Sequence, residues 1–481
     1  MRKKFLPNPA EAAGADPPRR VISSPPLELH LSRSIDRFES IQLKEPELVF
    51  GENHRCVDLR AGLAAYGPFK DANAANSGQL RVGIVGTGEA IKEALSLLEE
   101  ISRPIEQDPK LDCIRYPSFP GLNSGLPFSV DVLTQTSWHK SINSQLVRLA
   151  ADCGDSNAKY GMLRELYGAQ VRAMSQLEFP PNVVICALPA RVESSILKAA
   201  CAQYLPTEIV CDGKITEADG PHEDRATEAW NLTVRLLYKA GLTPCRLADA
   251  TSDSCFAGVS VHREHGSMTS EIWTSFAHVV TDLGIGFTLK GETIECSPKK
   301  EGDAPDLGKE HSARLMSRVL DAYRKSFGRS PSKVVVHKSS PFCEAERAGF
   351  VDSLRGFKQH ALISVKKSAI FFLRSGRKHI PRGAVIPFGE KLGIVYVSGY
   401  VPFLKCYPGN RMPQPFEITE NWGSLTFQEA AIDLLRLTKL NWNTSAFCSE
   451  VPATLALPGE AREIFRILGQ HDLVLNDRFC M

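Results

Sequence analysis

Short apolar runs alternate with amphipathic segments in the first half of the chain. From Gln79, QLRVGIVG is typical of a buried strand, and the following GEAIKEALSLLEEI has the spacing of a helix. The same order recurs at Val183–Pro189 (VVICALP) with ESSILKAACAQ, and at EIVCDG with ATEAWNLTVRLLYKAG. Such alternation predicts a mostly parallel, Rossmann-like sheet with helices on both faces.

The pattern changes after Pro244. Three strand-like runs follow closely, CFAGVSVHRE, EIWTSFAHVV and FTLKGETIEC, and then come a helical segment, the strand KVVVHKSS, further strands and terminal helices. This order predicts a second α/β domain with a mixed sheet. The leading residues contain two Pro pairs and few apolar clusters, which is typical of a flexible segment. The expected division is 1–78 as flexible N-terminal or linker segment, 79–250 as the first domain and 251–481 as the second.

Charge adds a local feature to this picture. The chain has 481 residues and a net charge of +2, but residues 351–411 hold eleven Lys and Arg against two acids. A basic stretch of this kind suits a polyphosphate partner. The alternative is a solvated basic face with no partner.

Cysteine spacing and hydropathy exclude several classes of protein. The thirteen cysteines occur singly, so neither a zinc site nor a redox pair is predicted. No apolar run approaches 18 residues, and the basic start has no apolar region of a signal peptide. A soluble cytoplasmic protein without membrane contact is expected.

Glycines at 83, 86 and 88 follow the first strand and precede a helix, which is one way to build a phosphate cradle. Their spacing differs from GxGxxG, and no acidic residue ends a clear second strand further on. An NAD-dependent oxidoreductase is therefore kept only as an alternative function.

Two strands of the second domain end in serines. A nuclease of the RNase H type needs carboxylates at such strand ends to hold two metal ions about 4 Å apart. The runs Phe256–His262 and Val334–Ser340 resemble the strands that bear these acids in the PIWI domain of Argonaute proteins, and the catalytic Asp positions fall on Ser260 and Ser339. The stretches Leu437–Thr444 and Gly399–Pro402 are also similar to PIWI segments.

The resemblance implies an inactive nuclease, because serine brings no charge to offset two divalent ions. An active nuclease that uses Glu264, Glu292 or Glu460 is the alternative.

The first domain is similar to the MID domain of Argonautes at Val183–Pro189 and Asn231–Leu247, and so the chain resembles the short prokaryotic Argonautes, which have MID and PIWI only. The resemblance implies a pocket for the 5′ phosphate of a guide strand, possible Mg²⁺ there, and the terminal carboxylate of Met481 as a metal ligand. Ala229, Thr233 and Cys245 depart from the family's pocket residues. Nucleic-acid contacts are expected from Trp230, Arg235, Lys239, Lys338, Lys366, Lys367, Arg374, Arg377, Lys439, Asn441 and Asn443.

The family also implies partners. These are a guide RNA, a target single-stranded DNA, and a separate effector subunit that carries an APAZ region. A sirtuin-like NADase is the expected effector, with a TIR NADase or a nuclease as alternatives, and a higher oligomer on activation. Effector activation would deplete NAD in antiphage or antiplasmid defence. A plain nucleic-acid-binding protein without a guide is the remaining alternative.

Overall fold

The computed structural model describes residues 39–70, 78–123, 128, 130–188, 192–211, 214–215, 224–251, 253–264, 271–296, 306–372, 379–408, 412–456, 459–469 and 474–480. Residues 40–481 form one unit by their contacts. Among the described residues, no helix is both long enough and apolar enough to span a membrane.

The first α/β part is built on a six-stranded sheet in the order β5-β4-β7-β8-β9, with β6 also paired to β4. Its central strands β4, β7 and β8 are parallel. The strands are β4 (Leu80–Gly86), β5 (Val132–Leu133), β6 (His139–Ser141), β7 (Val183–Leu188), β8 (Thr207–Cys211) and β9 (Lys214–Ile215).

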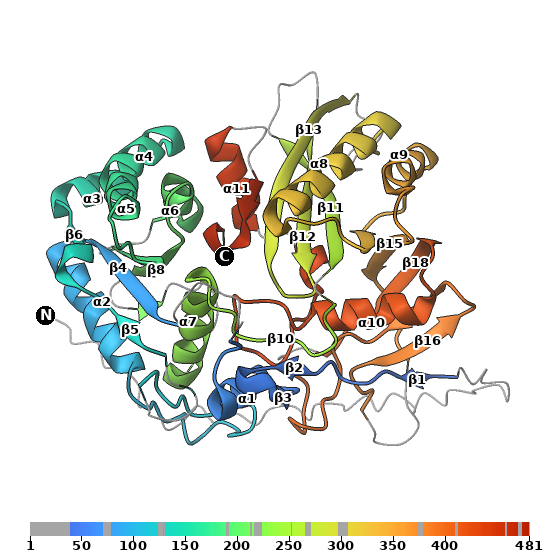
Figure 1. Ribbon diagram of the computed structural model, residues 1–481, viewed down its shortest axis with the longest axis horizontal. Coiled ribbons are helices and arrows are strands. Elements are labelled where there is room, and N and C mark those ends of the chain that lie inside the picture. The colour runs from blue at the N-terminus through green and yellow to red at the C-terminus, as the bar shows by residue number, and fades with distance from the viewer. Residues whose placement is uncertain are drawn as a thin grey trace, which may run out of the picture. The chain divides into compact units, whose positions relative to one another are not determined.

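Helices cover both faces of this sheet (Figure 1). Alternate residues of β4 explain why: Val82 and Ile84 belong to one hydrophobic cluster and Val85 to another. The helices are α2 (Gly88–Ile101), α3 (Ser144–Asp152), α4 (Ser156–Leu163), the π-turn η3 (Arg164–Gly168), α5 (Ala169–Ser175), α6 (Ser194–Cys201) and α7 (Arg225–Lys239), with the 3-10 turn η2 (Thr136–Trp138).

The second part has a ten-stranded mixed sheet in the order β1-β16-β17-β18-β15-β14-β11-β12-β13-β19. The centre is parallel, because β14 lies between β11 and β15 and runs in their direction. The strands are β11 (Ser254–Glu264), β12 (Glu271–Thr281), β13 (Gly286–Cys296), β14 (Lys333–Lys338), β15 (Gln359–Lys367), β16 (Ala384–Phe388), β17 (Leu392–Val395), β18 (Phe416–Gly423) and β19 (Val474–Asn476).

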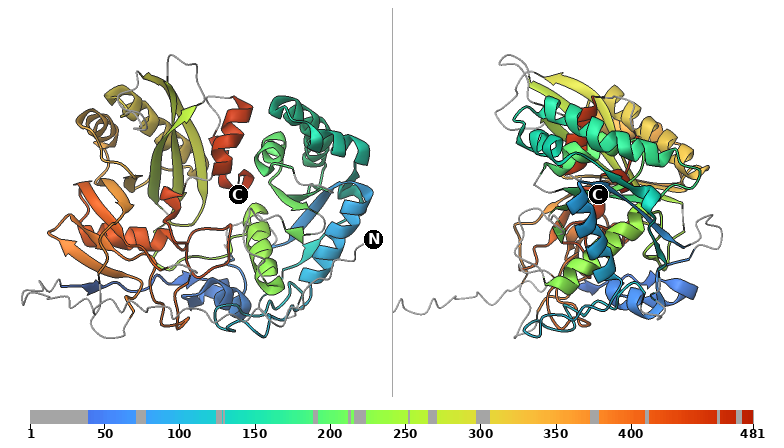
Figure 2. Two further views of the ribbon diagram at one scale, coloured as in Figure 1. Left: turned by 180° about the vertical axis from the view of Figure 1, so that it is seen from behind. Right: turned by 90° about the vertical axis from the view of Figure 1, so that its left-hand side faces the viewer.

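Helices α8 and α9 cover one face of this sheet, and helix α10 packs on the other face (Figure 2). The helices are α8 (Lys309–Phe327), α9 (Glu344–Leu354), α10 (Phe427–Leu437) and α11 (Gly459–Leu468), with the 3-10 turns η4 (Ala453–Leu455) and η5 (Asp477–Phe479). The predicted fold class, a parallel Rossmann-like sheet followed by a mixed sheet, is confirmed.

Residues 40–70 fall in the stretch that the sequence assigned to a flexible segment, yet they form regular elements. Several of their apolar side chains, among them Phe50 and Leu63, are fully buried. The segment contributes a strand to the edge of the ten-stranded sheet and two strands to a small sheet with β10. The elements are β1 (Ile41–Gln42), β2 (Leu48–Val49), η1 (Gly51–Asn53), β3 (Arg55–Cys56), α1 (Leu59–Tyr66) and β10 (Arg246–Leu247).

Candidate nucleic-acid interface

One face of α7 carries polar side chains at intervals of one helical turn. Asn231, Arg235 and Lys239 are four residues apart, so they lie above one another on the helix. They are only 2%, 8% and 2% exposed. Long cationic side chains are rarely buried this deeply unless they are paired. The face is therefore built around specific partners.

The main partner is Glu208 on β8. The Nε of Arg235 donates to its Oε1 at 2.9 Å, and the ammonium of Lys239 binds its Oε2. Lys239 also donates to the carbonyl oxygen of Thr207 at 2.9 Å. Lys198 of α6 is buried beside them and acts on the same carboxylate. In the described part of the chain, three cations thus gather around one acid.

The pKa values of the two closest partners reflect this crowding. Burial alone would raise the pKa of Glu208, but the charges of Lys239, Arg235 and Lys198 lower it to about 2. Burial lowers the pKa of Lys239 to about 8, and the repulsion of Lys198 and Arg235 adds to this, against the attraction of Glu208. The lowered pKa of Glu208 indicates that its surroundings favour the charged carboxylate. The lowered pKa of Lys239 indicates that its surroundings disfavour the charged ammonium. The difference arises mainly because burial disfavours the charge of Lys239, and the smaller repulsion between the cations is one that a further anion would relieve.

A loop from the second α/β part lies on the same face of α7. Arg235 NH1 donates to the carbonyl oxygen of Asn443 at 3.2 Å. Ser445 donates twice to Asn231 Oδ1, from its backbone N and its Oγ, both at 2.8 Å. Asn443 is exposed, and its N donates to Asn441 Oδ1 at 3.1 Å. The structure thus brings together four of the expected residues, Arg235, Lys239, Asn441 and Asn443.

Trp230 lies elsewhere on α7 and belongs to the core. It is 1% exposed, its ring is edge-on to Phe119 and stacked on Phe128, and its Nε1 donates to the carbonyl oxygen of Ser118. As placed, the ring is not available to stack on a nucleobase.

Lys439 is also enclosed. It is 4% exposed, forms an ion pair with Glu45 at 2.8 Å, and donates to the carbonyl oxygens of Val57 and Phe447. This ammonium fastens the segment before α1 to the second part, and it does not face a strand of nucleic acid.

The two serines at the expected catalytic positions are neighbours. The strands β11 and β14 are parallel, and Val259 pairs with Lys338, so Ser260 and Ser339 follow side by side. Ser260 is half-buried with its Oγ 3.1 Å from His262 Nε2, and Arg462 of α11 donates to His262 Nδ1 at 3.1 Å. Burial and the charge of Arg462 lower the pKa of His262. The positive charge of the Arg462 guanidinium therefore lies next to the His262 ring beside Ser260, and this charge disfavours a divalent cation there.

Of the three proposed replacement acids, only Glu292 has a described side chain, and it is engaged by other residues. Glu292 pairs with Arg314 at 2.7 Å and lies 3.4 Å from His311. The side chains of Glu264 and Glu460 lie outside the described residues.

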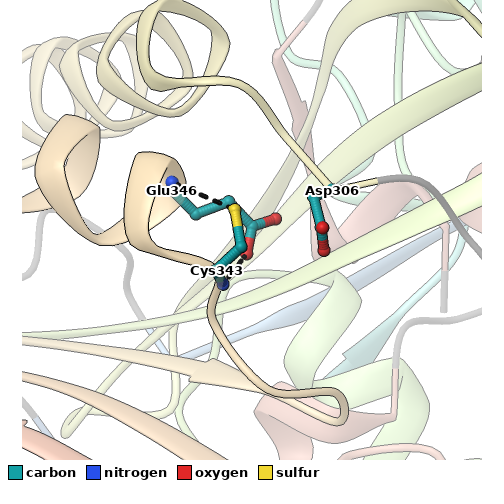
Figure 3. A group of neighbouring side chains, drawn as sticks. All are labelled: Asp306, Cys343 and Glu346. Atoms are coloured by element: carbon teal, nitrogen blue, oxygen red, sulfur yellow. Dashed lines mark hydrogen bonds between the residues drawn. The ribbon is translucent and has the colours of Figure 1, made fainter.

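Lys338 precedes Ser339 but points into the protein. Its Nζ binds both oxygens of the fully buried Glu346 at 2.7 Å, so it is not placed to contact nucleic acid. Glu346, Cys343 and Asp306 form the one group of three potential metal ligands among the described residues (Figure 3). Glu346 also accepts from the backbone N of Leu307 and of Cys343, which caps α9. With Lys338 on the same carboxylate, this cluster is a helix cap and an ion pair.

The basic stretch divides into structural and surface residues. Arg382 is 3% exposed and pairs with Glu45, and Lys391 donates to the carbonyl oxygens of Gly423 and Leu425. Lys366 and Lys367 are exposed at the end of β15. Arg374 and Arg377 lie outside the described residues, as does Met481.

The described residues near α7 suit a phosphate better than Mg²⁺. A magnesium site wants one or two available carboxylates and several waters. Here Glu208 is held by two cations, and Lys198 adds a third charge of the same sign. The ligand expected from Met481 lies outside the described part, so no step is assigned to a metal.

The glycines after β4 have a packing explanation. A Cβ at Gly86 would lie 2.6 Å from the carbonyl oxygen of Ala187, and one at Gly83 would lie 2.9 Å from Met174 Sδ. The first turn of α2 carries Glu89, whose charge opposes a phosphate at that helix end.

Sequence patterns did not identify Glu208, Lys198 or the pair His262 and Arg462. One signal was available for Glu208, because an acid inside an otherwise apolar strand is seldom buried without a cationic partner. The partner itself follows only from the packing of α7 on β8.

Solved Argonaute structures share this fold. Over 92% of this chain, the structure matches 55% of Clostridium butyricum Argonaute bound to a guide DNA and a 19-mer target DNA, with a TM-score of 0.62 and 17% identity. It matches 56% of Drosophila Piwi (TM-score 0.56, 15% identity, 92% of this chain). It also matches 55% of A. aeolicus Argonaute (TM-score 0.54, 15% identity, 92% of this chain). The chain thus spans about half the length of these proteins. No family model and no curated protein matches the sequence.

Proposed function

We propose that this chain binds a guide strand by its 5′ phosphate and uses the guide to hold a complementary target. The observation that carries this proposal is the buried group of Lys198, Arg235 and Lys239, at the place where α7 meets the loop around Asn443. A terminal phosphate carries nearly two negative charges and accepts several hydrogen bonds from such cations. The fold shared with an Argonaute that was solved with guide and target DNA supports the same reading.

The guide is an RNA and the target is single-stranded DNA in this proposal. The exposed Lys366 and Lys367 contact the phosphate backbone, which adds affinity that depends on salt and not on sequence. Sequence recognition then comes from base pairing between guide and target. The arrangement needs no side chain that reads a base edge.

The chain holds its target without cutting it. Ser260 and Ser339 take the positions where two carboxylates would be needed, and His262 and Arg462 occupy the space next to Ser260. A pair of hard metal ions needs negative ligands, which these groups do not provide. Any enzymatic activity belongs to a partner subunit.

That partner is an effector with an APAZ region, most simply a sirtuin-like NADase, which is switched on when the target is bound. The support is the resemblance of the sequence to the short prokaryotic Argonautes. A TIR NADase or a nuclease is the second candidate for the effector.

A target-capture experiment tests the proposal. The chain is loaded with a 5′-phosphorylated RNA and mixed with matched or scrambled single-stranded DNA in Mg²⁺ or Mn²⁺. We expect only the matched DNA to be retained, intact. Cleavage of the matched DNA would show that the chain is an active nuclease. Equal retention of both DNAs would show that it binds nucleic acid without using a guide. With the neighbouring gene product present, NAD consumption on matched target identifies the effector.

A further inference from the structure

A pocket of about 190 Å³ opens where α4, α6 and α11 meet, and its lining includes neither Glu208 nor a residue of α7. Its lining combines two aromatic rings, a guanidinium, an amide and an apolar floor. These groups belong to Tyr160, Arg164, Gln203, Tyr204, Ile467 and Leu468, with Ala199 and Ala200 beside them.

The walls of this pocket are held firmly. Tyr160 and Ile467 are half-buried and pack against two hydrophobic clusters at once, which fixes their positions. Arg164 begins the π-turn η3, and a Cβ at its last residue, Gly168, would lie 2.5 Å from the carbonyl oxygen of Ala200. The glycine therefore lets the turn lie close against α6. Turns of this kind are frequent at functional sites.

The polar ends of the lining side chains are available to a ligand. Within the part of the chain that the structure describes, the side chains of Tyr160, Arg164, Gln203 and Tyr204 have neither a hydrogen bond nor an ion pair. Arg164 and Gln203 are exposed, whereas both tyrosines are half-buried. The cation thus lies at the mouth of the pocket and the aromatic rings lie deeper.

We propose that this pocket binds one nucleotide, with its base against the tyrosines and its phosphate on Arg164. Aromatic rings stack on any base, and an arginine fork matches a phosphate. The amide of Gln203 can donate to and accept from a base edge. The volume corresponds to about six waters, below the roughly 300–1,000 Å³ of pockets for drug-sized ligands. It suits one base inside with the phosphate at the mouth, and the ligand is either a free nucleotide or one nucleotide of a bound strand.

Calorimetric titration of the full chain with 5′-mononucleotides, the matching nucleosides and inorganic phosphate tests this. We expect mononucleotides to bind the wild type saturably and nucleosides to bind it about tenfold more weakly. Mononucleotides should also bind Arg164→Ala about tenfold more weakly than the wild type. Tyr204→Ala should weaken the binding of both mononucleotides and nucleosides about tenfold, whereas Tyr204→Phe keeps the aromatic ring and should keep the affinity. The exposed Arg148 of α3 lies outside the lining, so Arg148→Ala is the matched control.

The inference is overturned if no mononucleotide saturates the chain by about 10 mM, or if binding survives both Tyr204→Ala and Arg164→Ala. Guide strands with a single abasic position separate the two sources of nucleotide. If an abasic site at one position of the guide lowers the affinity of the wild type but not that of Tyr204→Ala, the ligand of the pocket is a nucleotide of the bound strand. Competition by mononucleotide without such a position assigns the free ligand. The variants at Arg164 and Tyr204 leave the cations around Glu208 unchanged, so guide binding can fail while this site stands.

Discussion

Replacement of Glu208 by Gln tests whether the cations on α7 depend on this one carboxylate. The side chain keeps its shape but loses its charge, which leaves Arg235 and Lys239 buried without it. Breaking a buried ion pair by removing one partner costs about 3–5 kcal/mol. A drop in the pKa of Glu208 from 4.5 to about 2 corresponds to about 3 kcal/mol of stability. The two magnitudes agree.

Urea unfolding followed by tryptophan fluorescence measures this loss at neutral pH. A carboxylate with a lowered pKa stabilises the folded chain above pH 4.5, and this contribution disappears as the pH falls toward 2. The difference between the wild type and Glu208→Gln should therefore shrink in acid. Glu93 is exposed on α2, so Glu93→Gln is a matched control that stays within about 0.5 kcal/mol of the wild type. A loss below about 1 kcal/mol for Glu208→Gln would refute the reasoning.

The other predictions concern packing, pH and the leading segment. Gly258→Ala places a Cβ 1.7 Å from the carbonyl oxygen of Thr454 and should cost about 1–3 kcal/mol or more by thermal melting; an unchanged melting temperature would contradict this close approach. His278 lies at hydrogen-bond distance from Asp477 and from a carbonyl oxygen, and the charge of Asp477 raises its pKa despite burial. The contribution of His278 to stability is complete below about pH 6.5 and is lost as the pH rises through the folded pKa. The free energy of unfolding of the wild type should therefore exceed that of His278→Gln by more at about pH 6 than at about pH 9. Arg382→Met breaks the pair with Glu45 and should destabilise by about 3–5 kcal/mol, with faster proteolysis before α1; intact resistance to protease would count against that anchoring role.

The order of strands and helices could be predicted because burial imposes a period on the sequence. In β4 and β7 nearly every side chain is buried, as in a parallel sheet covered on both faces. The elements of residues 40–70 escaped prediction because they are short. The strands β1, β2 and β3 have two residues each, which is too few to show a period.

The candidate site was predictable only in part. Arg235 and Lys239 have helical spacing, so the sequence indicates that they share a face. Whether a lysine is exposed or enclosed depends on partners distant in sequence. Lys439 binds Glu45, and Lys338 binds Glu346. A basic stretch therefore indicates how much charge a region carries, and the packing decides which of these charges a strand can reach.

The most direct test is the affinity of the chain for a 5′-phosphorylated RNA and for its 5′-hydroxyl twin, at fixed salt, in the wild type and in Lys239→Met. Lys358 is exposed in the basic stretch, so Lys358→Met serves as the control. The account predicts at least about a tenfold preference for the phosphate in the wild type, which Lys239→Met abolishes and Lys358→Met keeps. Equal affinity of the wild type for both RNAs would contradict it.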